Sequence, residues 1–256
     1  MRSVFRALFM AFGMFSVIPA PKVWDESSAK HVMLWLPVVG AVIGTVWLGA
    51  AEVLGFFQLP MILAAAILMI MPYILAGFIH LDGYMDASDA ILSRRSLEEK
   101  LRILKDPHTG AFAVIMIAIL FIINFAAVYA FIDRGEFILM LPVIPVLSRC
   151  CCAMSVLCLR PMAQEGYAYV FKPAKAAPHR GWTAIIVCAA FTHAWFSCGA
   201  SGLIIAGAVM LGYAAAMLCA LAGFKFKGVS GDLAGFSLVI SELCGIFACA
   251  AIRGGF

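Results

Sequence analysis

Charged residues are scarce in this chain. Aspartate, glutamate, lysine and arginine together make up 12% of its 256 residues, whereas hydrophobic residues make up 64%. Soluble domains usually carry about 25% charged residues, so the composition excludes an ordinary soluble protein. Strands of alternating polar and apolar residues are absent as well, which excludes an outer-membrane barrel. The sequence therefore predicts an all-α, polytopic membrane bundle that forms a single domain over residues 1–256.

Other patterns are missing too. The nine cysteines form no CxxC pair and show no Cys/His ligand spacing, so we interpret them as packing residues. No basic patch is interleaved with aromatic residues, and we expect no nucleic-acid partner. The N-terminal segment 4–18 lacks the small-residue cleavage pattern of a signal peptide. We expect it to be retained, either as a short span or as a re-entrant hairpin.

Long apolar runs predict seven membrane spans, with the segment 4–18 as a candidate eighth. The predicted spans cover 32–57, 60–79, 111–132, 137–158, 182–198, 201–223 and 235–252. The connectors between them are either short or long and polar. The long connectors cover 20–31, 80–110, 159–181 and 224–234.

Lysine and arginine concentrate in the long connectors. Thirteen lie there, whereas the opposite side carries only Arg134 and Arg253. Basic loops remain on the cytoplasmic side of a membrane. The long connectors are therefore predicted to face the cytoplasm, and the chain to lie in a bacterial inner membrane. The thirteen are Lys22, Lys30, Arg94, Arg95, Lys100, Arg102, Lys105, Arg160, Lys172, Lys175, Arg180, Lys225 and Lys227.

Three aspartates gather where the second predicted span ends. The sequence HLDGYMDASD covers residues 80–89 and contains Asp82, Asp86 and Asp89. On a helix these side chains share one face, where like charges repel each other. Mg²⁺ offsets such repulsion, prefers carboxylate oxygens and commonly bridges a protein to the phosphates of a substrate. We therefore expect the three aspartates to bind Mg²⁺; the alternative is a solvated helix end.

A short amphipathic helix is predicted next, on the same side. The sequence SLEEKLRILKDPHTG covers residues 96–110, where Ser96 can cap the helix and Pro107 ends it. Asp106 is either a turn former or a residue that meets the aspartate cluster. His80, which precedes the cluster, is either an interfacial histidine with a hydrogen-bonded ring or, if Gly83 breaks the helix, a general base.

A second polar loop precedes the last predicted span. The sequence KGVSGDLAG, residues 227–235, places Ser230 and Asp232 among small residues directly before an apolar run. Such a turn predicts an anion cradle at a helix N-terminus, and Lys225 and Lys227 add positive charge for a phosphate. A simple loop is the alternative.

Two charged residues lie inside predicted spans. Arg149 and Glu242 are each about nine residues, or roughly 14 Å, from the predicted cytoplasmic end of their helices. Ionisable groups at such depth are candidates for function. Their equal depth also permits a purely structural Arg149–Glu242 ion pair.

The motifs together resemble the signature of cobalamin synthases, also called adenosylcobinamide-GDP ribazoletransferases. HLDGYMDASD, the following RRS and KDPHTG resemble the family pattern H-L-D-G-x-x-D-x-x-D-G, A-R-S and D-x-x-x-G. Weaker similarities are IPAPKVW, the Ser148–Arg149 pair, QEGYAYVF with Glu165, and SGDLAG with Glu242 in the helix that follows. Ala90 departs from the pattern, which has glycine at this position.

The resemblance implies the last assembly step of cobamide biosynthesis, with Mg²⁺ as the cofactor. In that reaction α-ribazole, or its 5′-phosphate, attacks the cobinamide-side phosphoryl group of adenosylcobinamide-GDP, and GMP leaves. Together with the motifs it leads us to expect His80, Asp82, Asp86 and Asp232 in catalysis, Asp82, Asp86 and Asp89 as metal ligands, and Arg95, Asp106, Arg149, Glu165, Lys225, Lys227, Ser230 and Glu242 in substrate binding.

Two other functions are weighed against this one. A CDP-alcohol phosphotransferase also places aspartates at a cytoplasmic helix end, but its pattern needs two further aspartates, and the apolar run AFAVIMIAIL follows Gly110 instead. A secondary transporter would need polar sites at the membrane midplane, and only Arg149 and Glu242 are predicted to be deep. The oligomeric state stays open, with a homo-oligomer as one alternative.

Overall fold

The computed structural model describes residues 2–173 and 176–252, and this part of the chain is helical without strands. The all-α prediction is therefore confirmed. The helices are α1 (Arg2–Phe15), α2 (Glu26–Ala29), α3 (Val32–Phe56), α4 (Met61–Leu75), α5 (Ile79–Leu92), α6 (Leu97–Ile103), α7 (Ala111–Arg134), the 3₁₀ helix η1 (Ile138–Met140), α8 (Val143–Cys158), α9 (Tyr167–Val170), α10 (Ala177–Gly223) and α11 (Gly231–Ala251).

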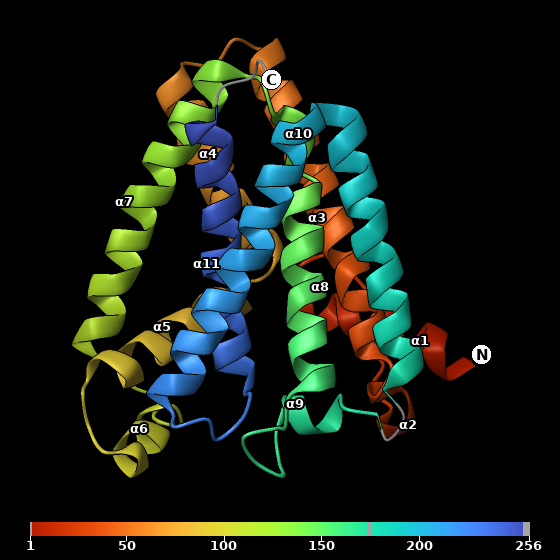
Figure 1. The fold of residues 1–256 in the computed structure, drawn as a ribbon, viewed down its shortest axis with the longest axis vertical. Coiled ribbons are helices and arrows are strands. Elements are labelled where there is room, and N and C mark those ends of the chain that lie inside the picture. The colour runs from red at the N-terminus through yellow and green to blue at the C-terminus, as the bar shows by residue number, and fades with distance from the viewer. Residues whose placement is uncertain (1, 174–175, 253–256) are drawn as a thin grey trace.

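The long helices run side by side along one axis, as expected for a multi-pass membrane bundle (Figure 1). Five helical segments within the described residues are long and apolar enough to cross a membrane, or up to six if α4 and α5 are taken as one bent span. The five are Val32–Phe56, Ala111–Arg134, Ile138–Cys158, Ala177–Gly223 and Gly231–Ala251.

Helix α10 consists of two arms that lie side by side (Figure 1). Its 47 residues are interrupted at Gly199, whose φ of 58° and ψ of −141° are not helical. The chain turns back there, and both ends of α10 lie at the end of the bundle that is drawn at the bottom of Figure 1, here called the lower end. The two arms correspond to the predicted spans 182–198 and 201–223.

The predicted span 60–79 is not one straight helix. Helix α4 ends at Leu75, and α5 begins at Ile79 after a bend of 91°. Gly77 and Phe78 make the bend with positive φ angles of 65° and 60°, a conformation that costs a side chain such as that of Phe78 some strain. Helix α5 therefore runs across the bundle near its lower end, and the aspartates do not continue a span (Figure 1).

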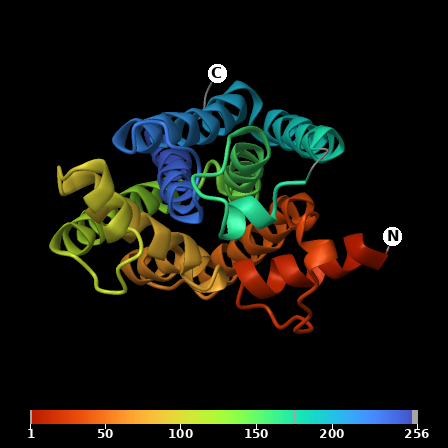
Figure 2. The ribbon, with the colours of Figure 1, turned by 90° about the horizontal axis from the view of Figure 1, so that it is seen from below.

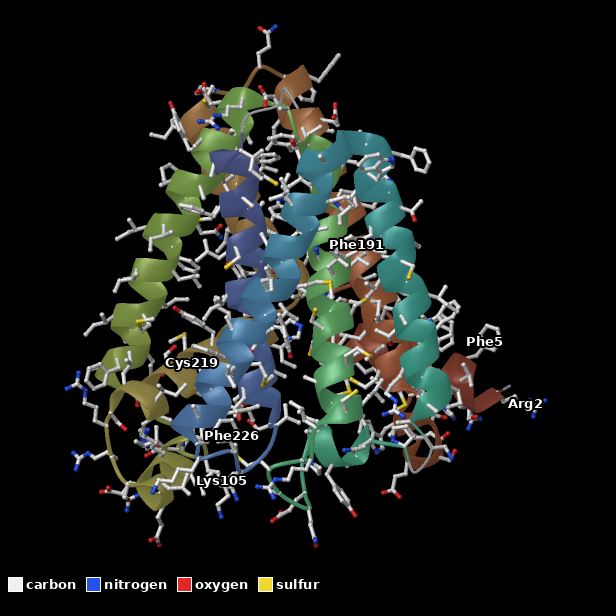
Figure 3. All side chains as sticks on the ribbon, viewed as in Figure 1. Arg2, Phe5, Lys105, Phe191, Cys219 and Phe226 are labelled. Carbon is white, nitrogen blue, oxygen red and sulfur yellow. The ribbon has the colours of Figure 1, made fainter. Side chains whose placement is uncertain are left out.

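The N-terminal segment is neither a span nor a re-entrant hairpin. Helix α1 has 14 residues, or about 21 Å, which is shorter than the roughly 30 Å of a bilayer core. It lies along one edge of the bundle, toward the lower end, and packs against α3 (Figures 1 and 2), with Arg2 and Phe5 at its outer end (Figure 3). Met10 and Ala11 are buried against the bundle, whereas Phe5 is exposed.

The described parts of the long polar connectors all lie at the lower end, and the short connectors lie at the opposite end (Figure 1). Helix α6 lies there, near Lys105 (Figure 3). Its predicted cap is confirmed, because Ser96 and Glu99 form a reciprocal capping box. Two basic residues of the predicted charge distribution, Lys175 and Arg253, lie outside the described residues.

Candidate active site

Helices α5 and α11 cross in unusually close contact at two glycines. A β-carbon on Gly83 of α5 would lie 2.9 Å from the Cα of Asp232, and one on Gly235 of α11 would lie 3.1 Å from the carbonyl oxygen of His80. Only residues without side chains allow the backbones to approach so far. The crossing brings Asp232, in the first turn of α11, beside the acidic helix α5.

Four carboxylates are neighbours at this crossing. Asp82, Asp86 and Asp89 lie on the single helix α5, as the spacing predicts. Asp86 is half-buried and feels the negative charges of Asp82, Asp232 and Asp89, while Asp232 also feels Asp82. Among the described residues, none of the four forms an ion pair with a basic side chain. The repulsion between these four residues, here called the carboxylate cluster, is therefore not relieved by any basic side chain within residues 2–173 and 176–252.

Gly110, which follows α6 and the turn at Asp106, contacts the carboxylate cluster. A β-carbon on Gly110 would lie 2.1 Å from Oδ2 and 2.2 Å from Oδ1 of Asp89, so the Asp89 carboxylate rests directly against the Gly110 backbone. Asp106 is exposed and accepts hydrogen bonds from the backbone N–H of His108 at 3.0 Å and from its ring. These hydrogen bonds lower the pKa of Asp106.

The donor atoms of the carboxylate cluster suit a hard divalent cation. All four residues offer carboxylate oxygens, which Mg²⁺ prefers. Within residues 2–173 and 176–252, no three Asp, Glu, His or Cys side chains converge closely enough to hold one ion by themselves. Mg²⁺ usually takes only one or two protein carboxylates and completes its shell with substrate phosphates and water, so the cluster fits an ion shared with a phosphorylated substrate.

His80 lies in the first turn of α5 and is buried, with 6% of its surface exposed. Helix α5 continues unbroken through Gly83, and the buried Nε2 of His80 has no hydrogen-bond partner among the described residues, so both the expected helix break and the expected hydrogen bond at Nε2 are wrong. Its ring stacks on that of Phe15 with a centroid distance of 5.9 Å. It lines a cavity of about 300 Å³ together with Asp82 and Asp232. Three of the residues predicted to be catalytic therefore share one cavity.

A second cavity, of about 260 Å³, also borders Asp232. Among the predicted residues, Glu165, Ser230 and Asp232 line it. The Ser230 hydroxyl caps α11 by accepting a hydrogen bond from the Leu233 N–H at 3.2 Å, so this helix begins at Gly231, ahead of the predicted span 235–252. Asp232 lines both cavities, so it lies at the boundary between them.

The predicted basic residues Arg95, Lys225 and Lys227 do not line either of the two cavities. Arg95 is exposed and pairs with Glu99 at 3.8 Å. Lys225 and Lys227 are exposed on the loop before α11 and line neither cavity. Lys105, which the motif analysis did not select, lines the second cavity instead.

The predicted pair between Arg149 and Glu242 is confirmed. The guanidinium of Arg149 on α8 contacts the carboxylate of Glu242 on α11 at 2.5 Å, with side-chain exposures of 1% and 8%. Ser148 donates a second hydrogen bond to the same carboxylate at 2.9 Å. Neither charged residue lines the 300 Å³ or the 260 Å³ cavity, and their part in substrate binding stays a prediction.

Sequence reasoning missed the aromatic residues of the site. Phe15, Tyr167 and Phe171 line the 300 Å³ cavity. Tyr167 and Phe171 belong to the motif QEGYAYVF, from which only Glu165 was assigned a role. Phe15 lies in an N-terminal segment that no motif connects to the site, and only the three-dimensional fold brings α1 there.

Comparisons with known proteins agree on one family. A protein of Clostridium botulinum strain Alaska E43, named adenosylcobinamide-GDP ribazoletransferase, is 38% identical over 97% of this chain and 98% of its own. Proteins of the same name from Clostridium perfringens strain 13 and Lachnoclostridium phytofermentans are 35% and 34% identical, over 98% and 97% of this chain and 100% and 94% of their own. No solved structure matches. A family model described as cobalamin-5-phosphate synthase matches residues 7–250, and the chain therefore belongs to the cobalamin-5-phosphate synthase family.

Proposed function

We propose that this chain is a membrane transferase that joins adenosylcobinamide-GDP to α-ribazole, or to its 5′-phosphate, and releases GMP. The family match over residues 7–250 carries this proposal, and the shared name of the curated relatives supplies the substrates. The carboxylate cluster is consistent with it, because transfer of a phosphoryl group needs charge neutralisation and positioning more than a protein nucleophile.

In the proposed step, a ribose hydroxyl oxygen of the ribazole attacks the phosphorus attached to cobinamide. The new O–P bond forms as the bond from that phosphorus to the bridging oxygen breaks, and GMP leaves with the bonding electron pair. The hydroxyl proton passes to a nearby base, for which His80, Asp82 and Asp232 at the 300 Å³ cavity are the candidates. The role of the protein is to hold the attacking and leaving oxygens in line.

We further propose that Asp82, Asp86 and Asp89 hold Mg²⁺, with Asp232 beside them. The all-carboxylate donor set and the unrelieved repulsion around Asp86 support this assignment. A bound Mg²⁺ supplies positive charge against the pyrophosphate and its leaving group. Asp89, which rests on Gly110, fixes the outer edge of the cluster.

The lower end of the bundle is proposed to face the cytoplasm of a bacterial cell, with the chain in the inner membrane. Twelve of the thirteen basic residues in the long connectors lie among the described residues, and the described parts of the long connectors lie at that end (Figure 1). Basic loops remain cytoplasmic. This orientation gives the carboxylate cluster access to a nucleotide-activated substrate.

The test is GMP release by the purified protein in lipid nanodiscs. Adenosylcobinamide-GDP and α-ribazole are supplied together and singly, with Mg²⁺ or with a chelator. GMP is expected only with both substrates and Mg²⁺. Turnover that is unchanged by the chelator would reject the metal assignment, and no turnover under any condition would reject the transferase.

The same preparation distinguishes the other functions considered. A CDP-alcohol phosphotransferase would release CMP when CDP-diacylglycerol replaces adenosylcobinamide-GDP. A transporter would take up substrate into proteoliposomes without releasing GMP. Either outcome would replace the proposed reaction.

A further inference from the structure

The 300 Å³ cavity beside the carboxylate cluster is built mainly of apolar and aromatic side chains. Its walls come from α1, α3, α5, α8, the segment Tyr167–Phe171 and α11, and they include Met33, Leu36, Val156 and Phe171. Pockets of about 300–1,000 Å³ hold small-molecule ligands. At this size the cavity suits a nucleoside and is too small for a corrinoid ring.

Four rings follow one another along the cavity wall. His80 stacks on Phe15 with ring planes 7° apart, and Phe15 meets Phe171 edge to face with a centroid distance of 6.4 Å. Phe171 in turn stacks on Tyr167 at 5.6 Å. Such rings favour a flat aromatic ligand, which can stack on their faces or contact their edges.

The carboxylates and the imidazole of the cavity lie on α5 and at the start of α11. They belong to Asp82, Asp232 and His80, beside the Gly231 backbone, and the Tyr167 hydroxyl and the Cys152 thiol are the other polar side-chain groups of the wall. A ligand that fills the cavity therefore has a flat apolar part and a polar part that faces the carboxylates. A ribonucleoside with an apolar aromatic base has this distribution, because its hydroxyl groups all lie on the ribose.

We propose that this cavity binds the incoming ribazole, with its aromatic base against Phe15 and Phe171 and its ribose toward Asp82 and Asp232. The proposal rests on the proposed transferase function and deepens it by assigning one substrate to one cavity. The second cavity meets the first at Gly231, Asp232, Tyr167 and Ala168. Two substrates, one bound in each cavity, would therefore meet at Asp232, as a transfer between them requires.

Guanosine is the competing occupant, since guanine is also flat. The edge of guanine carries several hydrogen-bond donors and acceptors, and leaving them without partners in an apolar site is costly. Met33, Leu36 and Val156 offer none. The second cavity contains Lys105, Glu165 and Ser230, which are better suited to a polar nucleotide.

The test compares two phenylalanines of α1. Phe15 lines the cavity, whereas Phe12 does not, and both pack partly buried against the same hydrophobic cluster. Phe15→Ala is expected to raise the KM for α-ribazole about tenfold, and to leave the KM for adenosylcobinamide-GDP within about twofold. Phe12→Ala is expected to change neither KM. If Phe15→Ala folds poorly, Phe15→Leu keeps an apolar side chain and removes only the ring.

The outcomes separate the two proposals. A wild-type protein that turns over, with a Phe15 variant that raises only the KM for adenosylcobinamide-GDP, would assign the cavity to guanosine and overturn the inference alone. Equal small effects of the Phe15 and Phe12 variants would overturn it as well. A wild-type protein that releases no GMP would overturn the proposed function and, with it, this assignment.

Discussion

Buried or half-buried charges form an ion pair at one place in the molecule and a cluster of like charges at another. On α8 and α11, Arg149 and Glu242 neutralise each other inside the bundle, and Ser148 satisfies the same carboxylate. On α5, Asp86 is half-buried beside three further carboxylates, with no basic partner among the described residues. A paired charge is compatible with a structural role. Clustered charges that the protein leaves unpaired require a partner from outside, here proposed to be Mg²⁺ with a phosphorylated substrate.

The largest expected effect is a loss of activity when one charge of the carboxylate cluster is removed. Asp86→Asn keeps the shape of the side chain and removes its charge, so kcat for GMP release is expected to fall about 10³-fold or more. The thermal unfolding midpoint Tm should not fall, because the substitution relieves repulsion from Asp82, Asp232 and Asp89. The matched control is Asp133→Asn, an exposed aspartate near the end of α7. Near-normal kcat at saturating Mg²⁺ would remove Asp86 from the metal site.

Removing one residue of the Arg149–Glu242 pair should instead lower the stability of the protein. Arg149→Met leaves Glu242 buried without its partner, which is expected to cost about 3–5 kcal/mol and to lower Tm by roughly 10 °C. The single charge reversals Arg149→Glu and Glu242→Arg should each lower Tm as well. The double variant restores a pair of opposite charges, and its Tm should be higher than that of either single reversal. If the double variant is no more stable than either single reversal, the pair is not simply structural.

Gly110→Ala should separate activity from stability. A methyl group there would strike the Asp89 carboxylate, which lies at the end of a flexible side chain and would swing away. We expect kcat to fall about 10- to 100-fold while Tm stays within about 2 °C. Gly55→Ala on α3 is the matched control, because its added carbon meets no atom within 4 Å. Unchanged kcat would show that the position of Asp89 does not matter.

Local chemistry made several features of the site predictable. The spacing of Asp82, Asp86 and Asp89 placed them on one helix, and Ser96 caps the helix that it was expected to cap. These features depend on residues within one or two turns of each other. The family resemblance, carried by the same local motifs, agrees with the match over residues 7–250.

What the sequence could not predict depends on contacts between distant segments. The 91° bend uses a left-handed Phe78, and no propensity points to a phenylalanine in that conformation. Val17 helps to fix the bend by donating its N–H to the Leu75 carbonyl at 2.9 Å, a contact from a separate segment. Ala90, which departs from the family pattern, is simply buried within α5, and that helix continues to Leu92.

The smallest expected effect tests a pair exposed to water. Arg95 and Glu99 lie 3.8 Å apart with side-chain exposures of 66% and 41%, so breaking this water-exposed pair should change stability very little. Arg95 was also predicted to bind substrate, whereas Glu99 was not. Arg95→Ala is therefore expected to raise the KM for adenosylcobinamide-GDP about threefold, and Glu99→Gln to leave it unchanged, with Tm nearly constant in both. If both variants have the same KM as the wild type, Arg95 is only a surface residue. The positive charge near the substrate must then come from another residue, and Lys105, which lines the second cavity, is the next one to test.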